Sequence, residues 1–552
     1  MATLVRLAVA LAATLGAGTS PGLSHEVERT SAKGPEKLGE VRFPVSCTSA
    51  AQQEFNRAMA LFHSFWFDHA KRSFAKVLEL DPACGMAYWG TSLMSMGNPF
   101  TWPSNPNASK AGAPAAAEAE RVGAKSDRER EYIAALAAFF KDWQTTEFRP
   151  RALAFEQAMG RLAEHYPKDV EAQILYALAL NITAQPSDKT FANQTKAADI
   201  LEPLFKKYPK HPGVAHYLIH TYDYAELAPK GLPSARVYGA IAPSVPHALH
   251  MPSHIYSRVG QWRNVVDGNR ASYRAAKAEL KDGGTLGIGA YDALHAMDYM
   301  VFAHLQQAQD KAAKALVDEA ASIQSVNVQN FVAAYAFAAI PARYALERGD
   351  WQQAASLQLR PAGLDWARFP QSESILVFAR GLGAARTGDV AAARTDAKRL
   401  EELKTALVTG KNVYWAGQTD FQMTTLNAWI ALAEQRPDEA VSLMRAAAKA
   451  EEASDKHPVT PGNVVPSREL LGEMLLELGK PVEAQEEFAK SLQRDPNRLR
   501  GLYGAARAAR AAGNPDATQK YNAKLKALIA ERDSVRPELV PVLTATASSA
   551  ER

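Results

Sequence analysis

The chain has 552 residues, 47% of them hydrophobic and 22% charged, a composition that indicates a folded, soluble protein and excludes a largely disordered one. Lysine and arginine (63) nearly balance aspartate and glutamate (59), and no basic stripe is interleaved with aromatic residues, so nucleic acid is not an expected partner. At this length we expect several domains or an extended repeat array.

The N-terminus has the pattern of a secretory signal peptide. Arg6 precedes an apolar run of mostly Leu, Ala and Val, and small residues follow, with cleavage expected between Gly18 and His25. The run is too short for a membrane span, and no later segment approaches twenty uncharged apolar residues. We therefore assign residues 1–24 to the signal and predict a periplasmic or secreted protein with no membrane span after signal removal.

Residues 25–47 are mostly polar and are predicted to form a flexible arm followed by one extended segment. The sequence has two cysteines. Cys47 is the last residue of this segment, and Cys84 lies further along the chain. In an oxidising compartment an even count favours a disulfide, which would contribute roughly 3–4 kcal/mol on the chain-entropy model. The alternatives are two isolated thiols, or a thiolate in a metal site.

Helix-pair repeats are predicted from Ala51 onward. Small and large apolar residues recur at helical spacing, because small residues let two antiparallel helices approach closely and large ones fill the gap. The small, large, small, aromatic and proline positions match the tetratricopeptide (TPR) pattern. They are Ala58, Leu61, Ala70, Phe74 and Pro82 near the start of the chain, and Gly472, Leu475, Ala484, Phe488 and Pro496 near its end.

Weaker copies of the pattern lie between these two repeats, and no run of alternating β-branched residues favours a sheet. The predicted fold is all-α: a right-handed α-solenoid of TPR-like helix pairs, interrupted by an irregular centre rich in histidine and proline. The predicted parts are N-terminal helix pairs (48–210), a His-rich central region (211–305), C-terminal repeats (306–532) and a polar tail (533–552).

Three stretches break the repeat. Residues 98–114 are too long and too rich in Pro and Asn for an inter-helix turn, and loops of that length often form a lid or rim. Residues 227–253 contain five prolines, which predict irregular backbone. Residues 456–470 hold His457, the only histidine after His304. Irregular stretches are where a repeat protein builds a specific site.

Several long strings carry a resemblance to a known group. They are LGEVRFPVSC, DPACGMAYWG, HPGVAHYLIHTYD, PHALHMPSHIY and KHPVTPGNVVPSRELLGEML. In these strings the chain resembles a group of exported bacterial tetratricopeptide-repeat proteins over nearly all of the sequence that follows the signal. The resemblance implies a helical solenoid exported to the periplasm or beyond, and it implies no activity.

The central region concentrates the histidines: six of thirteen fall within residues 211–254. His216 and His220 are four apart in a helical segment, so both imidazoles lie on one face within reach of one metal ion. Asp223 follows on the same face and could be a further ligand, or could orient His220 from outside the coordination sphere.

His250 and His254 are also four apart, with Pro252 between them. A helix starting at Pro252 would leave His250 on the preceding loop; a kinked helix would carry both on one face. His247 could join either arrangement. On the next helix, His295 and Asp298 form a further pair, in which Asp298 could be a ligand or support one.

Consecutive helices of a solenoid are neighbours, so these histidines could converge on one site. Nitrogen ligands with an occasional carboxylate suit zinc, copper or non-haem iron. The alternative is that they are ordinary core or hydrogen-bonded histidines. The strings HExxH, GxSxG and GxGxxG, a P-loop and paired CxxC are all absent, so no motif identifies a reaction.

A second candidate site is an aromatic and amide cluster that opens a helix, together with the isolated histidine downstream. It could line a ligand groove, or it could be one more helix start with packed aromatics. Its residues are Tyr414, Trp415, Gln418 and His457.

Three functions are therefore open. The first is a binding module that holds a protein, peptide or small ligand on its concave face, with a His-lined metal site in the centre. The second is a metal-dependent hydrolase or oxidase that uses that site. The third is a scaffold for assembly without a site.

Overall fold

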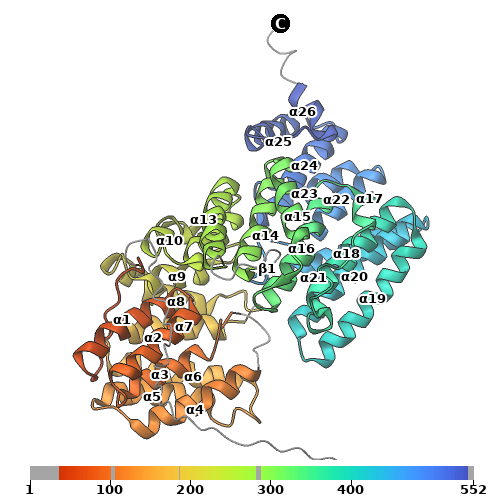
Figure 1. The fold of residues 1–552 in the computed structure, drawn as a ribbon. Helices are drawn as coiled ribbons and strands as arrows, with labels where there is room; N and C mark the ends of the chain where they lie inside the picture. Colours follow the sequence, from red (N-terminus) through yellow and green to blue (C-terminus); the bar gives the residue numbers. More distant parts are fainter. Residues whose placement is uncertain (1–35, 101–105, 186, 281–287, 545–552) are drawn as a thin grey trace, which may run out of the picture. The chain divides into compact units, whose positions relative to one another are not determined.

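The computed structural model describes residues 36–100, 106–185, 187–280 and 288–544. The predicted signal peptide, and the polar arm up to residue 35, lie outside the described residues. The described residues from Lys37 onward belong to one compact unit. In its described part, successive α-helices pack on one another along the chain, which confirms the all-α solenoid of TPR-like helix pairs (Figure 1). None of the described helices combines the length and the apolar character that a membrane span requires.

The first eight helices form the N-terminal pairs. The Thr48 side chain accepts a hydrogen bond from the Ala51 amide and so caps the first helix. The turn into the second helix passes through Phe65, whose φ of 54° is in the left-handed region. The elements are α1 (Ser49–His63), α2 (Phe67–Leu80), α3 (Gly85–Met94), α4 (Pro106–Val122), α5 (Asp127–Phe140), α6 (Phe148–His165), α7 (Val170–Thr183) and α8 (Ala192–Lys207).

Four helices of the central region have a proline in their first turn, where its missing N–H costs little, and two of these helices have only five and seven residues. Only Met251 separates α11 from α12, so the helix predicted from Pro252 is present. His250, however, ends its own helical turn, which Pro246 starts, and is not on a loop. The elements are α9 (Pro212–Tyr222), α10 (Ala228–Ile241), α11 (Pro246–His250), α12 (Pro252–Arg258), α13 (Trp262–Leu280), β1 (Ile288–Gly289) and α14 (Tyr291–Gln306).

The C-terminal half continues the helix pairs. A short strand in it pairs in parallel with β1. The elements are α15 (Asp310–Ser322), β2 (Ser325–Val326), α16 (Phe331–Glu347), α17 (Trp351–Ala355), the 3-10 helix η2 (Trp366–Arg368), α18 (Pro370–Thr387), α19 (Val390–Thr409), α20 (Val413–Ala433), α21 (Pro437–Glu452), α22 (Ser467–Glu477), α23 (Pro481–Arg494), α24 (Leu499–Ala511), α25 (Pro515–Leu528), the 3-10 helix η3 (Pro537–Leu539) and α26 (Val540–Thr544).

The two strongest repeats use the same close contact. Phe74 and Phe488 are fully buried, and each packs where a glycine sixteen residues later leaves room on the next helix. A Cβ on Gly90 would lie 2.1 Å from Cε1 of Phe74, and one on Gly504 would lie 2.2 Å from Cε1 of Phe488. The repeat pattern thus reflects a phenylalanine ring that packs directly on the backbone of the next helix, where glycine has no side chain.

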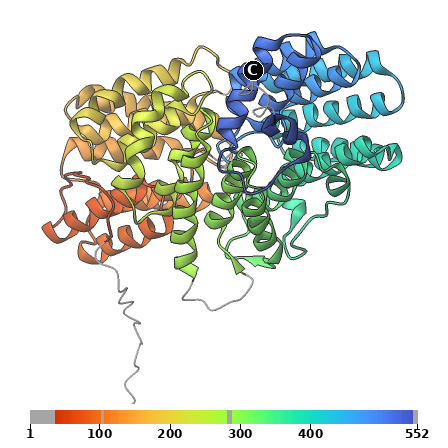
Figure 2. The ribbon, with the colours of Figure 1, turned by 90° about the horizontal axis from the view of Figure 1, so that it is seen from above.

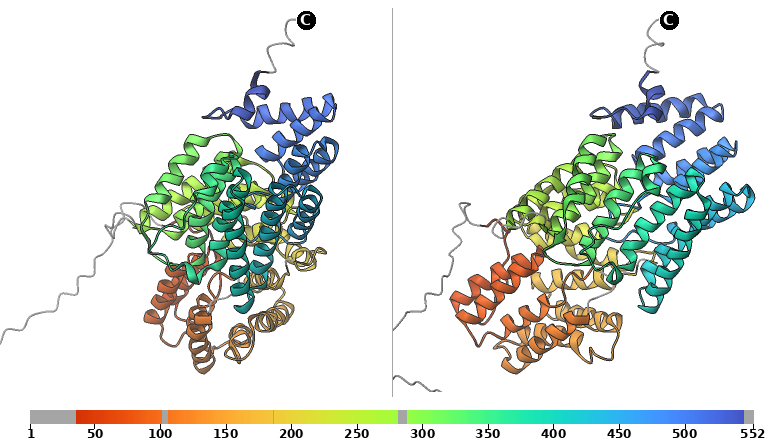
Figure 3. Two further views of the ribbon diagram at one scale, coloured as in Figure 1. Left: turned by 90° about the vertical axis from the view of Figure 1, so that its right-hand side faces the viewer. Right: turned by 45° about the vertical axis from the view of Figure 1, so that its right-hand side comes forward.

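The C-terminal half also contacts the centre. Figure 2 shows the C-terminal helices beside the central ones, and Figure 3 gives the same arrangement from two further sides. The Trp262 indole donates a hydrogen bond to the carbonyl of Asn497 over 2.7 Å. The segment between α21 and α22 places Lys456 against Asp223, 233 residues away in sequence. The irregular stretch after α21 is therefore part of the central region's surroundings.

The predicted loop over residues 98–114 is wrong in its second half. Helix α4 begins at Pro106 and continues past Pro114. Proline is tolerated in a first helical turn, and the alanine-rich sequence that follows has a high helix propensity, which outweighs the interior proline. Residues 101–105 lie outside the described residues.

The predicted polar tail, residues 533–552, is wrong at its start. Residues up to 544 form η3 and α26 and pack on the repeats, with Leu539 and Val542 buried. Arg536 is also buried and donates to both carboxylate oxygens of Asp310, the shortest distance being 2.7 Å. A few apolar side chains and one buried ion pair anchor a segment whose composition is otherwise polar.

The segment before α1 has no regular secondary structure but belongs to the core. Phe43 is fully buried, with its ring centroid 5.4 Å from that of Phe55 and 4.9 Å from that of Tyr132. Cys47, at the end of this segment, forms a disulfide with Cys84. The disulfide therefore ties the extended segment to the start of α3.

Candidate metal centre

Six histidines from four central helices gather in two neighbouring groups. In each group three ring nitrogens lie within 4.8 Å of one another, and two of the three side chains are buried while the third is half-buried. The first triad consists of His216 and His220 on α9 and His247 on α11. The second triad consists of His250 on α11, His254 on α12 and His295 on α14.

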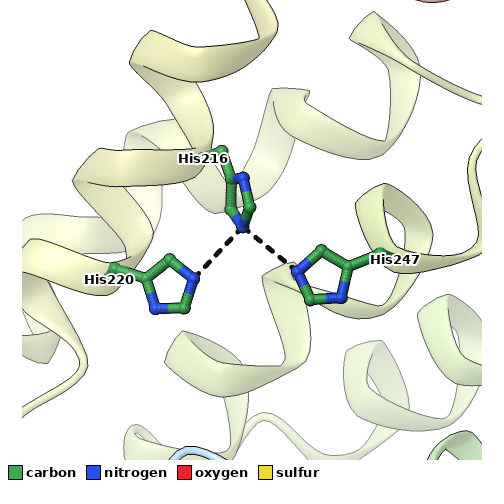
Figure 4. A group of neighbouring side chains, drawn as sticks. All are labelled: His216, His220 and His247. Carbon is green, nitrogen blue, oxygen red and sulfur yellow. Dashed lines mark hydrogen bonds between the residues drawn. The ribbon is translucent and has the colours of Figure 1, made fainter. Parts of the chain in front are cut away.

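In the first triad the rings point toward a common centre (Figure 4). His216 Nδ1 lies 2.7 Å from the carbonyl oxygen of His63, and because a carbonyl only accepts, Nδ1 carries the proton. His216 Nε2 is then an unprotonated nitrogen. It faces the Nε2 atoms of His220 and His247, each 3.2 Å away. This lone pair is available to a metal ion.

In the second triad, hydrogen bonds fix two tautomers. His250 Nδ1 donates to Asn269 Oδ1 over 2.6 Å, and the Asn269 amide nitrogen is already engaged with the Val265 carbonyl, so Oδ1 must be the acceptor. His254 Nδ1 donates to the carboxylate of Asp223 over 2.9 Å. Both histidines therefore carry their proton on Nδ1 when they are neutral, as metal-ligating histidines usually do.

These hydrogen bonds leave two lone pairs facing each other. His250 Nε2 and His254 Nε2 are 3.1 Å apart. Such a contact requires a cation, either a proton or a metal ion. Burial holds the pKa of His250 well below its ordinary value, and burial also lowers the pKa of His254 although Asp223 opposes this effect. A proton is thus disfavoured, and the geometry favours a metal ion.

Asp223 supports the second triad and does not point at His220. Its carboxylate accepts from Arg258 Nε over 2.9 Å and from Lys456 Nζ over 3.1 Å, besides His254. Burial alone would raise the pKa of Asp223, but Lys456, Arg258 and His254 hold it well below its ordinary value. Asp223 is therefore a buried anion that orients His254, and its lone pairs are already engaged.

Asp298, predicted as a ligand or support, has another partner. Its Oδ1 accepts from Arg343 Nε on α16 over 2.7 Å, and both side chains are fully buried. Arg343 also donates to Thr460 Oγ1 over 2.8 Å. Because a buried guanidinium takes up this carboxylate, Asp298 joins α14 to α16 and the stretch after α21, and the prediction of a role beside His295 is wrong.

Aromatic rings enclose the triads. Phe100 stacks on His220 with centroids 3.9 Å apart, and Tyr238 stacks on His216 at 5.1 Å. Phe65, from the first inter-helix turn, has its centroid 4.5 Å from that of His216. In the second triad, Tyr299 lies 4.6 Å from His250. These apolar faces reduce the contact of the rings with water and so favour neutral imidazoles.

The four residues predicted to line a ligand groove do border one pocket, together with residues of α16, α18 and the stretch after α21. Two of them also hold that stretch: the Tyr414 hydroxyl donates to the Asp455 carbonyl, and the Gln418 amide donates to Ser454 Oγ. The four are Tyr414, Trp415, Gln418 and His457.

A neighbouring pocket reaches the first triad. Tyr414 and His457 border it as well, and it extends to His220 and to the charged side chains of Asp455 and Lys456. A ligand in this pocket would contact the imidazole ring of His220 and a buried ammonium group. His457 therefore lies near the central histidines, although it is more than 150 residues away from them in the sequence, so no local pattern predicts this.

A third cluster of histidines has a different character. We call it the Glu171 cluster; it consists of His63, Glu171 and His211, all buried. The carboxylate accepts from His63 Nε2 over 2.9 Å and from His211 Nε2 over 3.0 Å, while His63 Nδ1 accepts from the Tyr217 hydroxyl. Burial alone would raise the pKa of Glu171, but the two histidines hold it below its ordinary value. The carboxylate therefore has two donors without a metal, while His211 Nδ1 is buried with no hydrogen-bond partner among the described residues.

Comparisons with known proteins add no function. No protein-family model matches the chain, and no curated protein matches it. Among solved structures, the Cut9–Hcn1 hetero-tetramer of the APC/C matches with a TM-score of 0.33 at 12% identity, over 85% of this chain and 77% of that one. The human IFIT1 dimer with m7Gppp-AAAA matches with a TM-score of 0.32 at 13% identity, over 90% of this chain and 99% of that one. Such low TM-scores support no inference about this protein.

Proposed function

We propose that the protein is an exported helical-repeat protein that binds transition-metal ions at the two histidine triads. One observation carries the proposal: His250 Nε2 and His254 Nε2 face each other at 3.1 Å while both Nδ1 atoms donate hydrogen bonds. Export is supported by the signal-like sequence of residues 1–24. The disulfide between Cys47 and Cys84 fits an oxidising compartment.

The donor set limits which ion would bind. Imidazole nitrogen suits zinc, copper and iron, whereas magnesium and calcium require oxygen ligands. Thiolate is excluded as a ligand because both cysteines form the disulfide. The hydrogen bonds from Nδ1 to His63, Asn269 and Asp223 would fix the ligand rings and raise their basicity.

Elemental analysis of the purified protein tests the proposal. We expect bound transition metal in the wild type and less of it in His250→Ala/His254→Ala. The matched control is His165→Ala/His304→Ala, which removes as many imidazoles outside the triads and should keep the wild-type metal content. Circular dichroism checks that each variant is folded. A wild type that takes up no zinc, copper or iron after reconstitution would overturn the proposal.

A second candidate function is a metal-dependent enzyme, hydrolase or oxidase. It is favoured by the pocket that joins His220 to Lys456, because a substrate there would lie beside the first triad. Lys456 is paired with Asp223, and Asp455 also lines the pocket, so the expected substrate is a small polar molecule that uses both charges. Screening small esters, phosphates and amines with the metal-loaded protein tests this candidate. It requires turnover by the wild type and loss of that turnover in Lys456→Met.

A further inference from the structure

The two triads are adjacent because neighbouring helices contribute to both. His247 and His250 are three residues apart on α11, so one short helix supplies a ligand to each triad. Their ring centroids are 6.2 Å apart, and those of His220 and His254 are 6.1 Å apart. These distances place rings of the two triads beside each other, so one small ligand could reach ions held in both.

The donors in this double site are all neutral. Each triad offers three imidazoles and no carboxylate, whereas di-iron sites in helix bundles use several glutamates to bridge and neutralise their ions. The nearest carboxylate, Asp223, is engaged by His254, Arg258 and Lys456. A purely nitrogen set suits copper, which also stands highest among the divalent first-row metals in its affinity for such ligands.

We propose that the two triads form one dinuclear copper centre, with one ion in each triad and a single oxygen ligand bridging them. This inference rests on the proposed function, since it requires that the triads bind metal at all. In the oxidised centre the bridge is a hydroxide: a water molecule binds both Cu(II) ions through its oxygen and gives one proton to solvent. No oxidant is needed, because both ions enter as Cu(II).

The fold makes a bridge more favourable than two separate ions. Two Cu(II) ions this close repel each other in a site walled by Phe65, Phe100 and Tyr299, where little water screens their charges. A shared hydroxide places a negative charge between them. The half-buried ligands, His247 and His295, belong one to each triad, so each triad has one side chain that solvent partly reaches.

Electron paramagnetic resonance (EPR) tests the pairing. The full-length protein is loaded with Cu(II) alone and freed of excess metal, and the copper per chain is compared with the double-integrated EPR signal. We expect one copper per triad and an integrated signal far below the bound copper, because a hydroxide bridge couples the two spins. The control His165→Ala/His304→Ala should behave in the same way.

Variants that lack one triad give the sharpest readout. His216→Ala/His220→Ala and His250→Ala/His254→Ala should each keep one copper, and its full EPR signal should appear. A variant that had merely unfolded would lose its bound copper and gain no EPR signal from a bound ion. Should a double variant fail to fold, the half-buried His247→Ala and His295→Ala serve the same purpose.

The outcomes separate the two proposals. Absence of bound copper, zinc and iron in the wild type overturns metal binding and the pair together. One copper in the wild type overturns the pair and leaves metal binding intact. Two coppers with full signal intensity overturn the bridge.

Discussion

The second triad and the Glu171 cluster each contain two buried histidines, yet their hydrogen bonds assign them different roles. In the Glu171 cluster, both imidazole N–H groups donate to one carboxylate; the remaining nitrogen of His63 accepts from a hydroxyl, and that of His211 has no hydrogen-bond partner among the described residues. In the second triad, both N–H groups point outward, to Asn269 and Asp223, and the bare nitrogens point inward at 3.1 Å. Burial of histidine alone therefore does not indicate a metal site; the direction of the protons does.

The strongest test of this comparison removes one histidine from each region. We expect His254→Ala to lose the metal of the second triad, because two ligands remain and Asp223 loses the imidazole that it orients. His211→Ala should retain the metal, because its ring donates to the Glu171 carboxylate and packs on His63, and neither residue belongs to a triad. Metal content after dialysis against a chelator measures both. Equal losses in the two variants would contradict the assignment.

The next effect concerns stability. Glu171→Leu leaves two buried imidazole N–H groups without an acceptor, at about 1–3 kcal/mol each, so we expect a loss of about 2–6 kcal/mol in the free energy of unfolding. Glu171→Gln keeps one acceptor oxygen and should lose less. Urea denaturation measures the loss. Metal content should be unchanged in the folded variants, and a fall in it would assign the Glu171 cluster to metal binding.

A destabilising change outside both regions tests whether metal is lost merely because the protein is less stable. Replacing both cysteines, as Cys47→Ser/Cys84→Ser, should cost about 2–4 kcal/mol, because the unfolded chain is no longer constrained. The disulfide joins the first extended segment to the start of α3, and neither cysteine belongs to a triad. Metal content should match the wild type at temperatures where the variant is folded, and loss of metal there would show that stability alone governs retention.

The smallest expected effect concerns the hydrogen bonds around the ligands. Asn269→Leu removes the acceptor for His250 Nδ1 while it keeps the branched shape of the side chain, so we expect metal affinity to fall by about 10–100-fold. Asn264→Leu, an exposed position on the same helix, is the matched control and should have no effect. Competition with a metal-binding dye measures the affinity. An unchanged affinity in Asn269→Leu would contradict the inferred tautomer of His250.

The fold could be predicted from the sequence because its signals are local. Phe74 and Gly90 show the packing of neighbouring helices, and Phe488 and Gly504 repeat it near the other end of the chain. The prediction failed where local signals conflicted. Prolines within 98–114 indicated a loop, but alanine propensity gave α4. The polar composition after residue 532 indicated an unpacked tail, but the ion pair of Arg536 with Asp310 holds this segment on the repeats.

The candidate site could be predicted only in part. The spacing of His216 with His220, and of His250 with His254, indicates two ligand pairs, since residues four apart share a helix face. The third member of each triad depends on how α11 and α14 pack, which no local pattern specifies. Lys456 reaches Asp223 across 233 residues, a contact that only the tertiary fold creates.

Anomalous diffraction from crystals of the metal-loaded protein, recorded at the absorption edge of the bound metal, tests the central claim most directly. The account predicts one peak within each triad, bonded to Nε2 of His216 in the first and to Nε2 of both His250 and His254 in the second. It predicts no peak in the Glu171 cluster. A peak between His63, Glu171 and His211, with none in the triads, would contradict it.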